Sequence, residues 1–196
     1  MSRVADAGDG RQPGDGRLAG FAPVVDVHCR LLILGSFPGR ASLVAGHYYA
    51  HPRNQFWPIL ASVLGQPLTT LPFEARYQTL LAHGIGLWDA IAACDRPGSL
   101  DADVRRIQAA SLVSLGQGLP RLRQVLLNGR LAWQQASRQP WPPGVTLVAL
   151  PSTSPAHAMM RFDEKLASWR TALLAPGMDE ARSADQQQQG GLDGPT

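Results

Sequence analysis

Three segments of the chain combine residue types that could bind a flat ligand carrying phosphate. In the segment from His51 to Trp57, the Asn54 amide can hydrogen-bond a ring and Phe56 can stack on one. In Gly35-Ser-Phe-Pro-Gly39, the glycines allow a ligand to approach the backbone closely. In Pro151-Ser-Thr-Ser-Pro-Ala-His157, short hydroxyl side chains and free backbone amides suit contacts with phosphate. A protein that extracts a base from DNA needs all of these features together.

Each segment also has a simpler interpretation. Asn54 could serve only as the N-cap of the helix that follows it. The segment Gly35-Ser-Phe-Pro-Gly39 could be a strand-to-helix turn without a ligand. Trp57 lies in an apolar helical stripe and is predicted to be core, whereas Phe56 at the helix start is predicted to be the stacking platform. Stacking of a base on an aromatic ring contributes about 1–3 kcal/mol.

The elements that would position these segments alternate between strands and helices. Short apolar runs predict buried strands, and segments with helical spacing lie between them. Such alternation predicts an α/β fold with three α/β/α layers around a central, mainly parallel, four-stranded sheet. The predicted strands cover residues 30–34, 84–89, 124–128 and 145–150, and the predicted helices cover residues 56–64, 73–83, 111–115, 131–137 and 163–174, the last capped by Asp163.

The loops at the carboxyl ends of such strands share one edge of the sheet, where ligands bind in open α/β folds. These loops follow Leu34, Leu87, Leu127 and Leu150. Most of them carry the unusual residues described above. This agreement predicts one pocket built from segments far apart in the sequence.

Composition narrows the class of protein. The formal net charge is +3, and arginine supplies nearly all the basic residues, which weakly favours a phosphate-bearing partner. The 2 cysteines, Cys29 and Cys94, are too far apart to form a zinc or iron–sulfur site and are predicted to be buried, so we expect no metal and no organic cofactor. Lys165 is predicted to lie on a charged face of the last helix, so a Schiff-base lyase step is not expected.

A single folded unit is predicted over residues 21–175. Residues 1–20 and 176–196 are polar and rich in glycine, and we expect both to be disordered tails. No apolar stretch approaches the length of a membrane span or a secretion signal. We therefore expect a cytoplasmic monomer without a membrane partner.

The motifs together resemble the uracil-DNA glycosylase superfamily, and most closely its hypoxanthine-DNA glycosylase (DNA-deoxyinosine glycosylase) family. Relatives specific for uracil in mismatches carry asparagine where this chain has Phe37, and phenylalanine cannot orient water. The resemblance covers residues 30–174. Its motifs are Leu34-Gly-Ser-Phe-Pro-Gly39 with Ser42, Tyr48-Tyr-Ala-His-Pro-Arg-Asn-Gln-Phe-Trp57, Gly86-Leu-Trp-Asp89, Asn128-Gly129 and Leu150-Pro-Ser-Thr-Ser-Pro-Ala156.

The resemblance implies a monofunctional DNA glycosylase that excises hypoxanthine from double-stranded DNA during base excision repair. It implies that Asn54 is the catalytic amide, and Asp89 is a candidate for orienting water or for a purely structural role. The expected base-binding residues are Gly35, Ser36, Phe37, Phe56, Asp89 and Asn128. The expected DNA-binding residues are Ser42, Ser152, Thr153, Ser154, His157 and Arg161, with Met159 and Met160 as a wedge into the duplex.

Three alternatives stay open. The first is a uracil-DNA glycosylase, including one specific for mismatches, which would differ only in the shape of the pocket. The second is a protein that binds damaged DNA without catalysis. The third is a serine hydrolase using Ser152 or Ser154, although the G-x-S-x-G elbow and a convincing acid partner are both missing.

Overall fold

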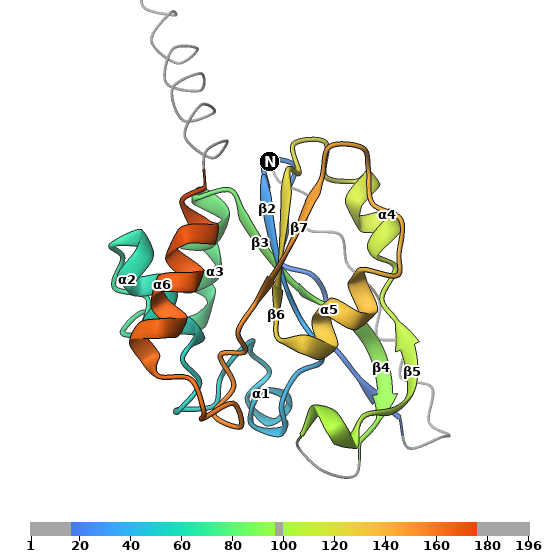
Figure 1. Ribbon diagram of the computed structural model, residues 1–196, viewed down its shortest axis with the longest axis horizontal. Helices are drawn as coiled ribbons and strands as arrows, with labels where there is room; N and C mark the ends of the chain where they lie inside the picture. The colour runs from blue at the N-terminus through green and yellow to red at the C-terminus, as the bar shows by residue number, and fades with distance from the viewer. Residues whose placement is uncertain (1–16, 97–99, 176–196) are drawn as a thin grey trace, which may run out of the picture.

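A four-stranded parallel sheet forms the centre of the molecule, in the strand order β3-β2-β6-β7. The computed structural model describes residues 17–96 and 100–175. All four strands run in the same direction, so their carboxyl ends meet at one edge of the sheet (Figure 1). The predicted sheet is therefore confirmed. Its strands are β2 (Leu31–Gly35), β3 (Ile85–Asp89), β6 (Gln124–Asn128) and β7 (Thr146–Leu150).

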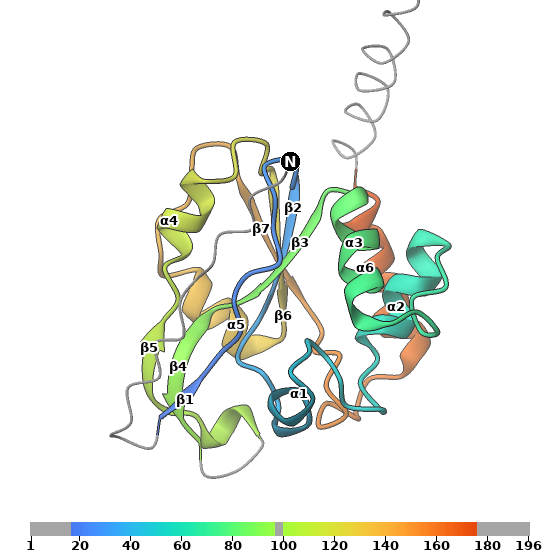
Figure 2. The same ribbon diagram turned by 180° about the vertical axis from the view of Figure 1, so that it is seen from behind.

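Helices cover both faces of this sheet, which confirms the three predicted layers (Figures 1 and 2). On one face lie α2 (Phe56–Leu64), α3 (Phe73–Ala82) and α6 (Phe162–Leu173). On the other face lie α4 (Leu112–Gln117) and α5 (Arg130–Ala136). The predicted cap of the last helix is wrong. The helix begins at Phe162, so Asp163 lies in its first turn, and the Glu164 carboxylate accepts the Arg161 N–H at 2.8 Å.

The side chains of β2 alternate between the two layers of helices. Leu31 and Ile33 pack into the core under α2, α3 and α6, whereas Leu32 and Leu34 pack toward α4 and α5. All of them are fully buried. A strand covered on both faces reads as a continuous apolar run, which is why the sequence indicates it so clearly.

A second, antiparallel sheet was not predicted. It has the order β1-β4-β5 and contains β1 (Leu18–Ala19), β4 (Ile91–Asp95) and β5 (Arg105–Ala109). Every residue of β5 is exposed, so no apolar alternation marks it in the sequence. β1 lies within the stretch predicted to be a tail, and most of both predicted tails, residues 1–16 and 176–196, lies outside the described residues.

Two short elements sit beside the carboxyl ends of the parallel strands. α1 (Arg40–Ala45) follows the loop after β2, and η1 (Asp101–Asp103) lies in the connection from β4 to β5. Neither was predicted from the sequence. Both contribute to the site described below.

The remaining sequence predictions concern cysteines and membrane spans. Cys29 and Cys94 are both buried and unpaired, as predicted, and burial raises the pKa of the Cys29 thiol to about 11. Within residues 17–96 and 100–175, no group of three potential metal ligands is found. No helix in these residues is long and apolar enough to span a bilayer.

Candidate functional site

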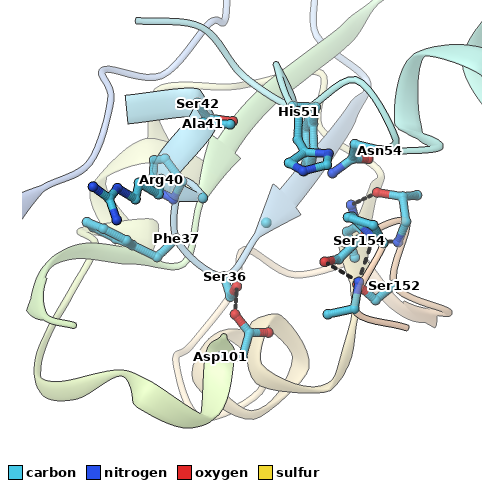
Figure 3. A pocket seen from close by; sticks show the side chains of 18 of the residues that line it. Ser36, Phe37, Arg40, Ala41, Ser42, His51, Asn54, Asp101, Ser152 and Ser154 are labelled. Atoms are coloured by element: carbon cyan, nitrogen blue, oxygen red, sulfur yellow. Dashed lines mark hydrogen bonds between the residues drawn. The ribbon is translucent and has the colours of Figure 1, made fainter. Parts of the chain in front are cut away.

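A pocket of about 760 Å³ opens at the carboxyl ends of the parallel strands. This volume is within the range of small-molecule sites. Figure 3 shows Asn54, Ser152 and Ser154 on one side of the pocket and Phe37 and Arg40 on the opposite side. Most of the predicted site residues line it, namely Gly35, Ser36, Phe37, Ser42, Asn54, Asp89, Asn128, Ser152, Thr153, Ser154 and His157. Phe56 and Arg161 do not.

The Asn54 side chain has one polar end engaged and the other directed to the pocket. Its Oδ1 accepts the Phe56 backbone N–H at 3.0 Å, directly at the start of α2. Among the described residues, its Nδ2 has no hydrogen-bond partner. The capping interpretation is wrong in detail, because Gln55 is the N-cap of α2 and no side chain caps the helix. The contact with the Phe56 N–H instead orients the Asn54 amide and leaves its N–H groups available as donors.

Phe56 does not serve as the predicted stacking platform. The ring is 0% exposed and belongs to the core between α2 and α6. Tyr49 stacks on it, with ring centroids 3.7 Å apart and planes 15° from parallel, while the Trp57 and Trp169 rings meet Phe56 edge to face. Tyr49 lines the pocket, whereas Phe56 does not. Trp57 is core, as predicted.

Tyr49 adopts a conformation that is uncommon for its residue type. Its φ is +54°, in the left-handed region, which costs free energy for a bulky side chain. Its neighbour Tyr48 fixes the loop, since the Tyr48 hydroxyl donates to the Ala22 carbonyl and the Tyr77 hydroxyl accepts the Tyr48 N–H. The sequence contains the pair Tyr48-Tyr49, but hydrophobic periodicity could not show which of the two rings faces the pocket.

Gly35 and Asp89 lie opposite each other at the ends of β2 and β3. A Cβ atom at Gly35 would lie only 2.3 Å from Asp89 Oδ1 and 3.1 Å from the Tyr49 hydroxyl. Any larger residue at Gly35 would displace both groups. The glycine is therefore required by close packing against Asp89, in addition to any approach of a ligand.

Asp89 is a buried carboxyl group on the floor of the pocket. Its pKa is raised to about 8, mainly by burial and also by the charge of Asp101, while the charge of Arg96 partly offsets this shift. Its Oδ2 is buried without a hydrogen-bond partner among the described residues. Asp89 is consequently largely protonated at neutral pH, so it is poorly suited to the predicted role of orienting water as a base.

The loop after β2 is fixed by groups from the connection between β4 and β5. The Ser36 hydroxyl donates to Asp101 Oδ1 at 2.7 Å, as Figure 3 shows. The Arg96 guanidinium lies 5.1 Å from the centre of the Phe37 ring and donates to the Pro38 carbonyl at 2.7 Å. The sequence analysis missed Asp101 and Arg96, because they belong to a connection that carries no recognisable motif.

Residues 151–157, here called the hydroxyl loop, are held by internal hydrogen bonds. The Asn128 Nδ2 donates to Thr153 Oγ1 at 2.9 Å, and the Thr153 N–H donates to Asn128 Oδ1 at 2.9 Å. Asn128, predicted to bind the base, thus uses both ends of its amide to tie this loop to β6. Ser152 Oγ accepts the Ser154 N–H, and Ser154 Oγ accepts the Ala156 N–H.

Lys165 anchors the far end of the hydroxyl loop. The prediction that it lies on a charged face is wrong, because its side chain is only 1% exposed and donates to the His157 carbonyl at 2.8 Å. Arg161 is exposed beside it and lies outside the pocket lining.

Two other predictions concern hydroxyl groups, namely Ser42 as a DNA contact and Ser152 or Ser154 as a nucleophile. Ser42, predicted to contact DNA, is buried, and its Oγ accepts the Ala50 N–H at 3.1 Å, which organises the loop before Asn54. Among the described residues, neither Ser152 nor Ser154 hydrogen-bonds a histidine or a carboxylate. The geometry therefore gives no support to a serine nucleophile.

The fold and the pocket define an α/β protein whose site gathers an amide donor, an aromatic ring and a hydroxyl-rich loop at one sheet edge. Residues 22–175 match the family model described as "Uracil DNA glycosylase superfamily". The chain belongs to this superfamily, as its motifs predicted.

Individual relatives are consistent with this assignment. The chain is 38% identical over 111 residues to the "Hypoxanthine DNA glycosylase" of Methanosarcina barkeri, covering 57% of this chain and 70% of the relative. It is 35% identical over 113 residues to the protein of the same name from Methanosarcina acetivorans, covering 58% and 72%. A solution NMR structure from M. acetivorans, described as a candidate uracil DNA glycosylase, superposes with a TM-score of 0.68 at 31% identity, covering 80% of this chain and 98% of that one.

Proposed function

We propose that this protein is a monofunctional DNA glycosylase that flips hypoxanthine out of double-stranded DNA and hydrolyses its glycosidic bond. Membership of the superfamily supports glycosylase chemistry, and the names of the two Methanosarcina relatives support hypoxanthine as the base. The single observation that carries the proposal is the Asn54 amide. Its carbonyl is fixed by the Phe56 N–H, and its Nδ2 is available in a pocket of suitable size.

The chemistry assigned to Asn54 is stabilisation of the leaving group. As the bond between sugar and base breaks, negative charge builds on the base, and an N–H donor already in position stabilises it without reorganisation. The Tyr49 and Phe37 rings line the pocket and can contact the faces of the flipped base. Flipping costs a few kcal/mol, and weak pairing of a deaminated base lowers that cost.

The single lysine favours a monofunctional reaction. A lyase step needs a free amine that can form a Schiff base with the sugar. The Lys165 amine is instead bound to the His157 carbonyl and does not line the pocket. We therefore expect abasic DNA as the product, with strand breakage only after alkali treatment.

The proposed DNA-binding surface is the rim of the pocket. Arg40 and Arg130 line the pocket and can bind phosphate oxygens, although neither was predicted from the sequence. Met159 is 98% exposed just beyond the hydroxyl loop, where it could enter the duplex in place of the flipped base. We propose that the protein acts on this substrate as a monomer.

The test is cleavage of labelled duplexes that each contain one hypoxanthine, uracil or xanthine, followed by alkali. Alkali-dependent cleavage of the hypoxanthine duplex is expected, and it should be lost in Asn54→Ala while duplex binding persists. A preference for uracil would support the first alternative. Binding without any product would support the non-catalytic alternative instead.

A further inference from the structure

Three residues of the pocket lining have a buried polar atom without a hydrogen-bond partner among the described residues. These atoms are Asp89 Oδ2, the Tyr49 hydroxyl and Arg96 Nε. The Arg96 guanidinium is held elsewhere, by the Pro38 carbonyl and the Phe37 ring. Buried polar atoms are usually satisfied in folded proteins, so Asp89 and Tyr49, which meet at the end of β2, are the groups of the lining most suited to a ligand.

The surroundings of Asp89 determine which form of the carboxyl group a ligand meets. Asp101 faces it from η1 with the same charge, and Arg96 faces it from the end of β4 with the opposite charge. Arg96 is itself committed to the Pro38 carbonyl and the Phe37 ring. The hydroxyls of Tyr48 and Tyr49 complete the surroundings, and burial raises their pKa values, so they stay neutral.

In this arrangement the protonated Asp89 carboxyl group can donate a hydrogen bond, whereas an ionised carboxylate at the same position could only accept one. No basic side chain forms an ion pair with Asp89 in the described residues. Burial favours the uncharged acid and raises its pKa to about 8, while Ser36 holds Asp101 close by through its hydroxyl. A neutral carboxylic acid beside a departing group is a proton source at neutral pH.

We propose that the Asp89 carboxylic acid is the proton donor to the departing purine. This inference rests on the proposed glycosylase function and names a second reacting group beside Asn54. As the bond between C1′ and N9 breaks, its electron pair stays with the base, and the Asp89 proton passes to a ring nitrogen of that base. Water adds to C1′, and the proton it releases restores the acid, so the products are hypoxanthine and an abasic site.

The proposed roles of Asn54 and Asp89 differ because an amide and a carboxylic acid differ in their chemistry. The Asn54 amide can stabilise negative charge on the base but cannot neutralise it. A purine offers basic ring nitrogens in its imidazole and pyrimidine halves, which uracil lacks. We therefore expect loss of Asp89 to slow hypoxanthine excision more than any residual excision of uracil.

The first experiment measures single-turnover rates on the hypoxanthine duplex from pH 6 to pH 10 for the wild type, Asp89→Asn and Asp101→Asn. The wild-type rate should be constant at low pH and fall above about pH 8. Asp89→Asn should lower the plateau about 10²-fold and abolish that fall, because the amide has no proton to transfer. Asp101→Asn should move the fall to lower pH, since removal of a neighbouring negative charge lowers the pKa of Asp89.

The control is Asp163→Asn, which removes an exposed carboxylate in the first turn of α6 and should leave the pH profile unchanged. The N1–H of hypoxanthine also titrates in alkali. A fall in Asp89→Asn with the same midpoint and depth as in the wild type would thus belong to the substrate alone and would overturn the proposal. Should Asp89→Asn fail to fold, an unmoved profile in Asp101→Asn would overturn it equally.

A second set of duplexes identifies the acceptor. Duplexes with 7-deaza- or 3-deaza-hypoxanthine each lack one ring nitrogen, and the wild type and Asp89→Asn should become equally slow on the analogue that lacks the acceptor. An undiminished difference on both analogues would overturn proton transfer to N7 or N3 of the purine. If the wild type does not cleave the hypoxanthine duplex, the proposed function fails, whereas equal rates and profiles for wild type and Asp89→Asn refute only the role of Asp89.

Discussion

Two walls of the pocket differ in how their polar groups are used. One wall, here called the acidic wall, consists of Gly35, Ser36, Tyr49, Asp89 and Asp101. It contains a strained tyrosine with φ of +54°, a buried carboxyl group with a raised pKa and two unpaired buried polar atoms. Each of these features lowers stability, and such features concentrate at functional sites.

The other wall is the hydroxyl loop, and its Ser152, Thr153 and Ser154 side chains each take part in a hydrogen bond within the protein. Thr153 and Asn128 exchange two hydrogen bonds, and the Ser152 and Ser154 hydroxyls accept backbone N–H groups within the loop. Lys165 supports the loop from beneath through the His157 carbonyl. No side chain of the hydroxyl loop has a buried polar atom without a hydrogen-bond partner among the described residues.

The difference indicates a division of roles within one site. Groups that change their hydrogen-bond partner or their charge during a reaction often lower the stability of the free protein. The acidic wall contains groups of this kind, so it is suited to chemistry on the base. Side chains of the hydroxyl loop are engaged in hydrogen bonds within the protein, so the loop has a fixed shape and can present its backbone to a ligand. This suits it to positioning the DNA. Variants in the two walls should therefore change different steps.

The largest effect is expected from Asn54→Asp, which stands next to the acidic wall. The aspartate keeps the oxygen that accepts the Phe56 N–H but replaces the N–H donor with negative charge, facing a base that gains negative charge. We expect the single-turnover rate to fall about 10²–10³-fold. Duplex binding and thermal unfolding should stay near wild type. A rate near wild type would show that the Asn54 amide acts only by holding the backbone at Phe56.

Asp89→Asn should increase stability by an amount that depends on pH. The native state keeps a proton that the unfolded chain releases between about pH 4 and pH 8, because burial raises the pKa from 3.8 to about 8. Wild-type stability should therefore fall by up to about 1.4 kcal/mol per pH unit across this window and level off above it. The asparagine variant lacks this slope. Denaturant unfolding at pH 5, 6, 7 and 8 measures it, and parallel stability curves would contradict the raised pKa.

The parallel sheet was predictable because its strands are buried on both faces. Leu31–Gly35 is a continuous apolar run of 5 buried residues, which has few other interpretations. The edge of the sheet that carries the site followed from the strand direction alone. By contrast, Arg105–Ala109 is exposed along its whole length, so the second sheet had no apolar pattern to reveal it.

The site could be predicted where sequence motifs mark its residues. It could not be predicted where tertiary packing determines which side chain faces the pocket. The sequence predicted that Asn54, Phe37 and Asp89 lie at the ligand edge, because each ends or follows a strand or precedes a helix, and all three line the pocket. It could not show that Tyr49 rather than Phe56 faces the pocket, since both are aromatic and close in sequence. Burial of Lys165 was equally hidden, because the side chain lies in a helix whose neighbours are charged.

Thr153→Val should test whether the hydroxyl loop serves mainly to position DNA. Valine keeps the shape of threonine but leaves the buried Asn128 Nδ2 without its acceptor, at a cost of about 1–3 kcal/mol. We expect a lower thermal midpoint and weaker duplex binding, with a smaller change in the rate at saturating enzyme. Thr153→Ser keeps the hydroxyl and is the matched control. A loss confined to the saturated rate would assign this wall to the chemistry instead.

The smallest effect is expected from Ser154→Ala, and it decides whether any hydroxyl in that loop reacts. The Ser154 hydroxyl accepts only the Ala156 N–H at 3.3 Å, near the surface, so its loss should change stability by less than about 0.5 kcal/mol. The excision rate should stay within about twofold of wild type, because among the described residues the Ser154 hydroxyl hydrogen-bonds neither Asn54 nor Asp89. Ser168→Ala, which removes an exposed hydroxyl from α6, is the matched control for the assay. A large loss in Ser154→Ala alone, together with labelling by a serine-directed reagent, would favour the hydrolase alternative and reverse the roles of the two walls.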